Sequence, residues 1–286
     1  MNGLKLVIGS PNASSWSLRP WLLLKQLRLP FEEIVIPLRR PETAELIRGY
    51  SPSGKVPVLL ADGLRIWDSL AIAEYLAESH PTLWPADRAT RALARAACSE
   101  MHSGFSALRT FLPMDFCARF DPPGRLLAPV ERDIERIMAL WTDCRRAATE
   151  PGPFLFGAFT IADAMFAPVC SRFTTYAVPL SSAAQAYVGQ MMGLPAMREW
   201  GRLAQAELTA GGPMATRPRT ATTPPPRGPV AAAPAPVPEE ATAPPVPPEI
   251  PAAEPLAAED ELRRGPRPIP TTIMVKPIGD GTRRRR

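Results

Sequence analysis

The order of strand-like and helix-like patterns constrains the fold of this chain more than any other feature of its sequence. Over the first 80 residues, short apolar runs alternate with amphipathic stretches, and the turn Asp62-Gly63 joins two of the runs into a hairpin. The predicted strands span 4–9, 31–36, 56–60 and 64–67, and the predicted helices span 17–28, 41–48 and a stretch that starts at 68–69. This order predicts a small mixed four-stranded sheet that is covered by helices.

After Pro81 the sequence carries only helical patterns, with Pro and Gly in the loops between them. The predicted helices span about 88–112, 130–148, 160–177, 182–192 and 195–208. We therefore predict an α/β domain over 1–80, a linker over 81–87 and an all-α domain over 88–208. Pro20 is expected in the first turn of its helix, where a missing N–H costs nothing, so that this helix would begin near Ser17.

The last part of the chain has a different composition. Residues 211–286 hold 19 of the 37 prolines and no aromatic residue, so this segment cannot bury enough apolar surface to offset its ordering entropy. We predict a disordered Pro/Ala-rich tail over 209–286. Residues 1–210 carry 22 basic and 20 acidic side chains, and this near-neutral balance argues against a body that binds nucleic acid.

Several other classes of protein are disfavoured. The cysteines show no C-x-x-C spacing, which indicates reduced thiols and a cytoplasmic location, and the two histidines show no metal-site spacing. The N-terminus does not resemble a secretory signal, and no apolar run is long enough to span a membrane. The four cysteines are Cys98, Cys117, Cys144 and Cys170.

A group of hydroxyls stands at the junction of the first strand and the first helix. Ser14, Ser15 and Ser17 lie between the apolar run that ends near Gly9 and the apolar face that begins at Trp21. A hydroxyl at such a junction is well placed to meet a ligand, and it is equally well placed to cap the helix. The residues alone leave both roles open.

Four motifs in order give the chain a resemblance to a known family. They are Ser14-Ser-Trp-Ser-Leu-Arg19, Gly54-Lys-Val-Pro-Val58, Asp68-Ser-Leu-Ala-Ile-Ala-Glu-Tyr75 and Phe159-Thr-Ile-Ala-Asp163. Over about residues 4–208 the chain resembles a cytosolic glutathione transferase, and its Ser-Ser-x-Ser-x-Arg form is similar to that of the zeta class. The resemblance implies a thioredoxin-like domain that binds glutathione, an all-α domain that lines the pocket of an electrophile, a homodimer, and no metal.

The resemblance assigns the sulfur of glutathione to Ser14, with Ser15 as the alternative and Ser17 as a helix cap. One hydroxyl and a helix N-terminus are expected to lower the pKa of a thiol by about 1–2 units from roughly 8.5. The resemblance also implies that the Val56-Pro57 bond is cis and that the main chain of Val56 binds the cysteinyl unit, and a cis X-Pro bond is physically accessible.

The two ends of glutathione are assigned in the same way. Asp68 and Ser69, at a helix start, would bind the ammonium and carboxylate of the γ-glutamyl unit, and simple capping by Ser69 is the alternative. Lys55 would bind the glycyl carboxylate, with Arg39 and Arg40 as alternatives. Two further residues of the motifs are expected to be structural: Arg19 as a tie between the domains, and Asp163 as part of a capping box with Thr160.

The electrophile pocket is expected along the first long helix of the all-α domain. Met101, Phe105 and Arg109 recur there at four-residue spacing, which would place them near one helix face, although such residues are more often core. Arg109 would favour anionic substrates, and Trp16 is a further candidate for the wall of the pocket.

The function that follows is that of a glutathione transferase, in which the thiolate held by Ser14 attacks a soft electrophile. One alternative is the cis/trans isomerisation of a maleyl-type diacid by reversible addition of glutathione; Trp16 departs here from the Cys of the zeta motif. Another is a non-catalytic binding protein that uses its tail as an arm for an unknown partner. No nucleic acid or membrane partner is expected.

Overall fold

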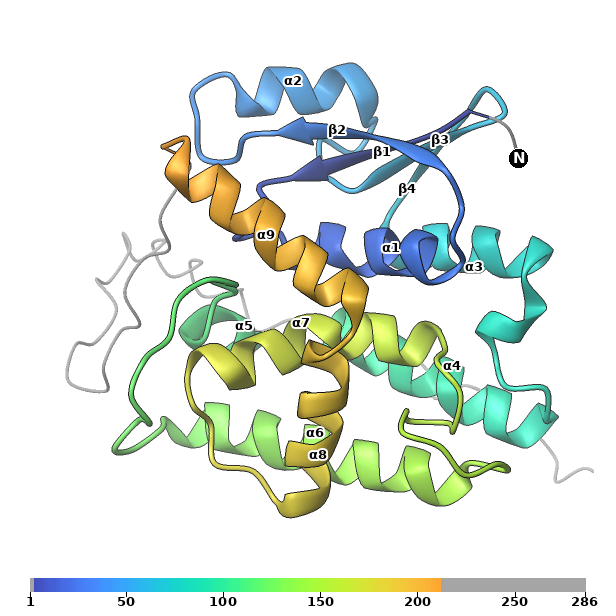
Figure 1. Cartoon of the computed structure of the whole chain (residues 1–286), viewed down its shortest axis with the longest axis vertical. Coiled ribbons are helices and arrows are strands. Elements are labelled where there is room, and N and C mark those ends of the chain that lie inside the picture. Colours follow the sequence, from blue (N-terminus) through green and yellow to red (C-terminus); the bar gives the residue numbers. More distant parts are fainter. Residues whose placement is uncertain (1–2, 212–286) are drawn as a thin grey trace, which may run out of the picture. The chain divides into compact units, whose positions relative to one another are not determined.

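The computed structural model describes residues 3–211, so the prediction for the Pro-rich tail lies outside the described residues from 212 onward. The N-terminal part contains one four-stranded sheet with the strand order β2-β1-β3-β4 (Figure 1). β1 pairs in parallel with β2 and antiparallel with β3, and β3 pairs antiparallel with β4. The prediction of a mixed sheet is confirmed. The strands are β1 (Leu4–Gly9), β2 (Phe31–Ile36), β3 (Val58–Ala61) and β4 (Leu64–Trp67).

Helices cover both faces of this sheet. The three helices of this part are α1 (Ser15–Gln26), α2 (Thr43–Tyr50) and α3 (Ser69–Ser79). α2 lies on one face and packs Ile47 against Val7, Ile36 and Val58, whereas α1 and α3 lie on the other face (Figure 1). Successive residues of a strand point to opposite faces, which is why Val7 joins α2 while its neighbours in β1 join the larger core.

The C-terminal part consists of helices, as predicted. They are the 3₁₀ turn η1 (Pro81–Leu83) followed by α4 (Arg88–Ser103), α5 (Ser106–Phe111), α6 (Ala128–Ala147), α7 (Ile161–Thr175), α8 (Ser182–Met192) and α9 (Pro195–Thr209). α7 is the central helix, buried along almost its whole length, and it packs against α1, α4 and α8. One continuous apolar core joins the two parts, so the boundaries proposed at 81 and 88 stay a prediction.

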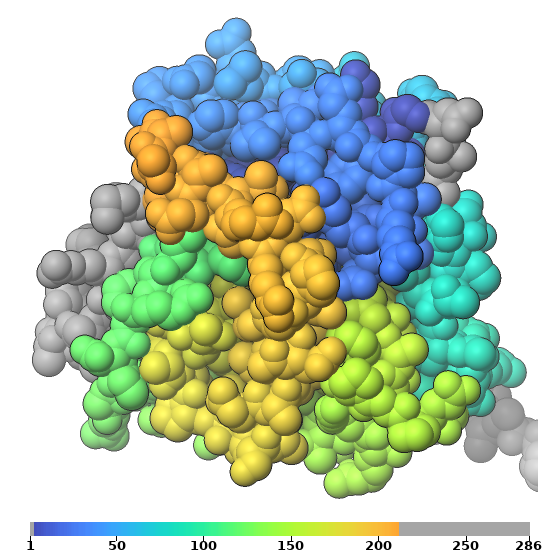
Figure 2. All heavy atoms as spheres, viewed as in Figure 1, coloured from blue at the N-terminus to red at the C-terminus, as the bar shows by residue number. Residues whose placement is uncertain are grey.

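α9 packs against both the sheet part and the helical part. Figure 2 shows it lying across the junction of the sheet part and the helical part. Trp200 of α9 is fully buried and meets Trp21 of α1 edge-on, with 5.0 Å between ring centroids. Lys25 of α1 forms an ion pair with Glu199 of α9 at 2.8 Å. The last helix is thus fixed to the first one.

Asp163 organises the start of α7. Its carboxylate accepts hydrogen bonds from the Leu155 N–H at 3.0 Å, the Thr160 N–H at 2.8 Å and the Tyr187 hydroxyl at 3.0 Å. The capping box predicted between Thr160 and Asp163 is confirmed. The box therefore satisfies donors from a loop and from α8 as well as from its own helix.

The predicted start of the first helix is wrong. α1 begins at Ser15, because the Ser14 carbonyl already accepts the first helical hydrogen bond from Leu18. Pro20 is therefore in the second turn and not the first. The fixed φ of proline suits a helix, and the helix loses only the one hydrogen bond that the N–H of this residue would have donated.

The single helix predicted over 88–112 is also wrong. α4 ends at Ser103, Phe105 adopts a left-handed conformation with φ 59°, and α5 starts at Ser106. At Gly104 a Cβ would lie 2.8 Å from the Glu100 carbonyl oxygen, so the chain needs glycine to leave the helix here. The apolar periodicity gave no sign of this break.

Three further properties follow from residues 3–211. None of the helices in this range is both long and apolar enough to cross a lipid bilayer. The same range contains no group of His, Cys, Asp and Glu side chains that could hold a metal ion. All four cysteines are free thiols.

Candidate functional site

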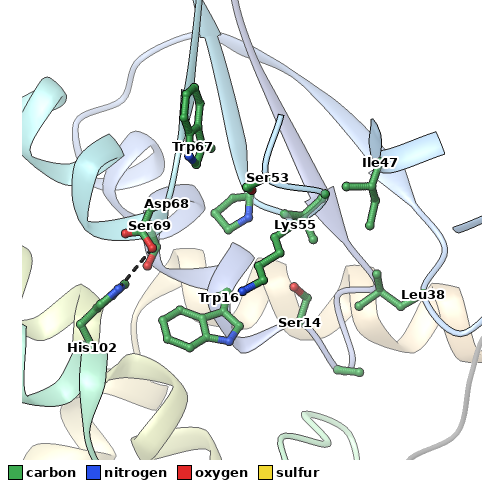
Figure 3. Close-up of a pocket in the computed structure, with 14 residues that line it drawn as sticks. Ser14, Trp16, Leu38, Ile47, Ser53, Lys55, Trp67, Asp68, Ser69 and His102 are labelled. Atoms are coloured by element: carbon green, nitrogen blue, oxygen red, sulfur yellow. Dashed lines mark ion pairs between the residues drawn. The ribbon is translucent and has the colours of Figure 1, made fainter. Parts of the chain in front are cut away.

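A cavity of about 650 Å³ opens where the loop after β1, the loop before β3 and the start of α3 meet (Figure 3). The cavity brings together most of the residues that the sequence singled out, although they come from distant parts of the chain. These residues are Ser14, Trp16, Lys55, Val56, Pro57, Asp68 and Ser69. His102 of α4, which the sequence analysis did not assign to the site, lines the cavity too.

Ser14 is the residue that precedes α1, and its side chain makes no capping bond. Its hydroxyl donates to Ser17 Oγ at 2.7 Å, and Ser17 Oγ also accepts from the Gly9 N–H at 3.0 Å. Ser17 is therefore a link between the end of β1 and Ser14, and its predicted role as a helix cap is wrong. If the Ser14 hydroxyl turns toward a ligand, the Ser17 hydroxyl can donate to Ser14 in its place.

Ser15 faces away from the cavity. Its hydroxyl oxygen accepts from Arg172 of α7 at 3.3 Å, and it is not among the lining residues. This geometry separates the two serines that the motif left as alternatives: Ser14 is the one that a ligand in the cavity can reach.

The loop that carries Ser14 is held from the helical part. The Asn12 N–H donates to Glu207 of α9 at 3.0 Å, and Trp200 Nε1 donates to the Pro11 carbonyl at 2.9 Å. The Asn12 carbonyl and side-chain oxygens accept from the backbone N–H groups of Phe116 and Cys117, both at 3.0 Å. The position of Ser14 thus depends on residues that follow it by 100 positions or more.

The wall opposite Ser14 is the segment before β3. The Val56-Pro57 bond is cis, as the resemblance implied. The Lys55 side chain extends into the cavity, and within residues 3–211 it forms no ion pair with a carboxylate (Figure 3). Arg39 and Arg40, the alternatives for Lys55, do not line the cavity, and Arg40 donates to the Gly211 carbonyl.

Asp68 and Ser69 form the third wall. Asp68 is the N-cap of α3, where its Oδ1 accepts from the Leu70 N–H at 2.8 Å, so the suggestion that Ser69 caps this helix is wrong. Asp68 also has a positive φ of 77°, which is unusual for a residue other than glycine. Ser69 Oγ accepts from Arg19 at 3.4 Å, so Arg19 supports this wall. Among residues 3–211 no hydrogen bond joins the Arg19 side chain to the helical part, so the expected tie between the domains is not found there.

His102 lies in the last turn of α4 and reaches across to Asp68. Its Nε2 is 3.2 Å from Asp68 Oδ2, and its ring meets Trp16 edge-on at 5.2 Å (Figure 3). Burial and the charges of Arg19 and Arg109 lower the pKa of His102, although Asp68 opposes them. His102 is one of only two histidines, and this rarity is the signal that the sequence offered.

Trp16 is held between two guanidinium groups. Arg19 and Arg109 lie over its ring at 4.3 Å and 4.6 Å. Burial, followed by the charges of Arg109 and Arg172, lowers the pKa of Arg19 well below its usual range. Burial and Arg109 likewise lower the pKa of Arg172 to about 10. A dense positive charge therefore stands directly behind this wall of the cavity.

The residues proposed for an electrophile pocket on α4 are not brought together with the cavity. Met101 and Phe105 are buried in the core, and the break at Gly104 leaves Met101 on α4 while Phe105 and Arg109 belong to the start and the body of α5. The Arg109 guanidinium donates to the carbonyls of Met101, His102 and Gly104, and so closes the C-terminus of α4. Trp16 is the one member of the predicted set that lines the cavity.

These walls suit a particular kind of ligand. Two helix N-termini favour anionic groups, Asp68 offers a carboxylate for a cation, and Lys55 offers an ammonium for a second carboxylate. The Ser14 hydroxyl can donate to a polarisable anion between them. An extended, peptide-like molecule with charged ends and a soft nucleophile fits this arrangement.

The fold and the site together define a two-part protein with a thioredoxin-like domain, a helical domain and a ligand cavity at the end of the first strand. The chain matches the family models for the glutathione S-transferase N-terminal domain over residues 13–79 and C-terminal domain over residues 125–200. It belongs to the glutathione S-transferase family, and the resemblance seen in the sequence is confirmed at this level.

Similar proteins support the same family. A probable maleylacetoacetate isomerase from Caenorhabditis elegans is 37% identical over 99 residues, which are 34% of this chain and 45% of that protein. The chain thus matches less than half the length of this curated relative. A glutathione transferase homologue from Burkholderia strain BGR1, solved with bound glutathione, is 24% identical with a TM-score of 0.55, covering 72% of this chain and all of the other. The tau-class transferase of mango, Mangifera indica, is 19% identical with a TM-score of 0.54, covering 72% and 98%. At these identities the two structures show the fold alone.

Proposed function

We propose that this protein is a glutathione S-transferase, in which the thiolate of glutathione attacks a soft electrophile. The observation that carries the proposal is the single cavity that joins Ser14, the cis Val56-Pro57 segment and the Asp68-Ser69 pair. Ser14 and the Val56 main chain suit the cysteinyl unit of glutathione, and the Asp68-Ser69 pair suits the γ-glutamyl unit.

Glutathione is held by its two ends and its middle. The Ser69 hydroxyl and the N-terminus of α3 bind the γ-glutamyl carboxylate, and Asp68 binds the ammonium of the same unit. The main chain of Val56 binds the cysteinyl unit, and Lys55 binds the glycyl carboxylate. This placement leaves the sulfur beside Ser14.

Ser14 stabilises the thiolate form of the bound sulfur. A hydrogen bond to an anion contributes roughly 1.5–3 kcal/mol, which lowers the pKa of the thiol by about 1–2 units. In the structure the Ser14 hydroxyl donates to Ser17, so it turns toward the sulfur when glutathione binds, and Ser17 then donates to Ser14. The enzyme contributes a thiolate at neutral pH and a fixed position for it.

The test measures the pKa of the thiol of bound glutathione in the full-length protein, using the absorbance of the thiolate across a pH series. Ser14→Ala is expected to raise this pKa by about 1–2 units and to reduce kcat/KM for conjugation by roughly 10- to 100-fold. Ser15→Ala is the matched control and should leave the thiol pKa within about 0.3 units of its starting value. Unchanged turnover in Ser14→Ala would remove the role given to this residue, and absence of glutathione binding by the unmodified protein would overturn the function.

A second candidate is the cis/trans isomerisation of a maleyl-type diacid, with glutathione added and released in each cycle. It is supported by the similarity to the probable maleylacetoacetate isomerase and by the arginines behind Trp16, whose charge would attract a dianion. Proton NMR of a maleyl diacid incubated with protein and glutathione distinguishes the candidates. Glutathione-dependent appearance of the trans isomer supports isomerisation, and a stable thioether supports conjugation.

We propose in addition a homodimer located in the cytoplasm, as is usual for the family. Light scattering after size-exclusion chromatography should give about twice the chain mass of 31.1 kDa. A non-catalytic binding protein remains the alternative from another class, and binding of glutathione without turnover of any electrophile in a broad panel would favour it.

A further inference from the structure

We propose that His102 is a positioning residue for the γ-glutamyl end of the site: its neutral imidazole donates to Asp68 and fixes the carboxylate that receives the ammonium of glutathione. This inference rests on the proposed function. His102 belongs to the helical part and lies outside the motifs of the thioredoxin-like domain.

The geometry gives each oxygen of Asp68 a separate donor. Oδ1 accepts from the Leu70 N–H at 2.8 Å, and Oδ2 lies 3.2 Å from His102 Nε2. A carboxylate oxygen has two lone-pair sites, so each oxygen keeps one for a ligand. The Asp68 side chain is 45% exposed, which leaves room for an ammonium to approach from the cavity. Asp68 is therefore held on one side and open on the other.

His102 is itself held rigidly enough to act as a fixed donor. Its ring packs edge-on against Trp16 at 5.2 Å, and Trp16 is clamped between Arg19 and Arg109. Arg109 also closes the end of α4 by donating to the His102 carbonyl. The ring of His102 is thus held by Trp16 of α1, and its backbone is held by Arg109 of α5.

Burial and two neighbouring cations favour the neutral form of His102. Asp68 of α3 faces its Nε2, and Arg19 of α1 and Arg109 of α5 contribute positive charge from behind. His102 Nδ1 is buried without a hydrogen-bond partner within residues 3–211, so a proton there would be an unpaired buried donor. Burial and the charges of Arg19 and Arg109 lower the pKa of His102 below its usual value, against the opposing charge of Asp68.

The neutral form matters because Asp68 must keep its charge for the ligand. A neutral imidazole orients the carboxylate by a hydrogen bond and leaves its negative charge available. A protonated imidazole would neutralise that charge and compete with the ammonium of glutathione. Affinity for glutathione should therefore be highest where His102 is neutral and should fall as the pH drops through the pKa of His102.

Three variants of the full-length protein test this role by calorimetric titration with glutathione. His102→Phe keeps an aromatic ring against Trp16 but removes the donor, and it should weaken binding about three- to tenfold at pH 7.5. His102→Gln keeps a neutral N–H donor near the same place and should bind within about twofold of the unmodified protein. His80→Gln replaces the only other histidine, at the end of α3, and is the matched control.

Three readouts separate positioning from a general structural effect. An analogue of glutathione that lacks the amino group has nothing to place on Asp68, so His102→Phe should not weaken its binding. As the pH is lowered from 7.5 through the pKa of His102, binding of glutathione should weaken in the unmodified protein and change less in His102→Gln. In steady-state assays His102→Phe should raise KM for glutathione with less than a twofold change in kcat.

Equal losses for glutathione and for its deamino analogue would overturn the inference, as would equal pH dependence in the unmodified protein and His102→Gln. If His102→Phe fails to fold, the pH comparison decides alone. Failure of the unmodified protein to bind glutathione would instead overturn the proposed function together with this inference, so the two failures are distinguishable.

Discussion

At the scale of single residues, the chemistry assigned to Ser14 depends on a second hydroxyl. Ser17 is fully buried and accepts from both the Gly9 N–H and the Ser14 hydroxyl. When the Ser14 hydroxyl turns to a sulfur, the Ser17 hydroxyl can donate to it, and a donated hydrogen bond makes a hydroxyl a stronger donor in turn. Ser17 therefore contributes to the pKa of the thiol without touching it.

Ser17→Ala should raise the pKa of bound glutathione by about 0.5 units, less than Ser14→Ala. It should also lower the free energy of unfolding by about 1–3 kcal/mol, because the buried Gly9 N–H loses its acceptor. Ser171→Ala is the control, since Ser171 is buried and its hydroxyl has no partner within residues 3–211. A thiol pKa that does not move in Ser17→Ala would confine Ser17 to a structural role.

The sequence predicted one group of these residues and missed another. Ser14, Val56 and Asp68 stand in local motifs, so their approach to one cavity could be inferred from the family resemblance. The partners that orient them could not. A serine near a helix start commonly caps the helix, so the sequence favours that role for Ser17. His102 meets Asp68 only through the packing of α4 against α3.

At the scale of elements, the start of α7 concentrates several polar groups in the core. The Asp163 carboxylate accepts four hydrogen bonds, from Leu155, from both the N–H and the hydroxyl of Thr160, and from Tyr187. Burial nevertheless raises its pKa to about 6. The ionised form is thus present at neutral pH, although its removal from water costs free energy.

Asp163→Ala should lower the free energy of unfolding by about 3–5 kcal/mol at pH 7, since it leaves several buried donors without an acceptor. Asp163→Asn should cost less, and it does not titrate. Because the folded pKa lies above the unfolded value of about 3.8, the folded state holds an extra proton between those values. The advantage of the unmodified protein over Asp163→Asn should therefore shrink as the pH rises from 4 to 6 and then level off. Urea unfolding across this pH range measures it, and an advantage that grows with pH would contradict the raised pKa.

Element boundaries show where periodicity stops being informative. The mixed sheet and most of the longer helices are predictable from the sequence, because the apolar residues of each element recur at the period of that element. Two local features produce the break between α4 and α5. Gly104 approaches the Glu100 carbonyl closely, and Arg109 donates to carbonyls at the end of α4. Neither changes the apolar pattern, so 88–112 looked like one helix.

At the scale of the whole molecule, the site is completed by the helical part. The loop 10–14 belongs to the sheet part, but Glu207 and Trp200 of α9 supply partners for its backbone. Residues 195 positions apart in the chain thus fix the entry to α1. Sequence patterns report local periodicity and short motifs, so a contact of this length was beyond them. The dependence of the thiol site on the last described helix is a property of the fold.

The role of α9 predicts an effect on catalysis from outside the cavity. Glu207→Ala removes the acceptor of the Asn12 N–H, which should loosen the loop that carries Ser14 and lower kcat/KM about three- to tenfold. Glu207→Gln keeps an amide oxygen as an acceptor and should stay within about twofold. Gln205→Ala changes an exposed residue of the same helix and serves as the control.

Hydrogen exchange connects the kinetic effect to its cause. The amides of residues 12–14 should exchange faster in Glu207→Ala than in Glu207→Gln, because a loop without this hydrogen bond opens more often. Exchange at the amides of β1 should be unchanged. Glutathione binding should slow exchange in the same loop in the unmodified protein. If kcat/KM falls in Glu207→Ala while exchange at residues 12–14 stays the same, the carboxylate acts through its charge and not through the position of Ser14.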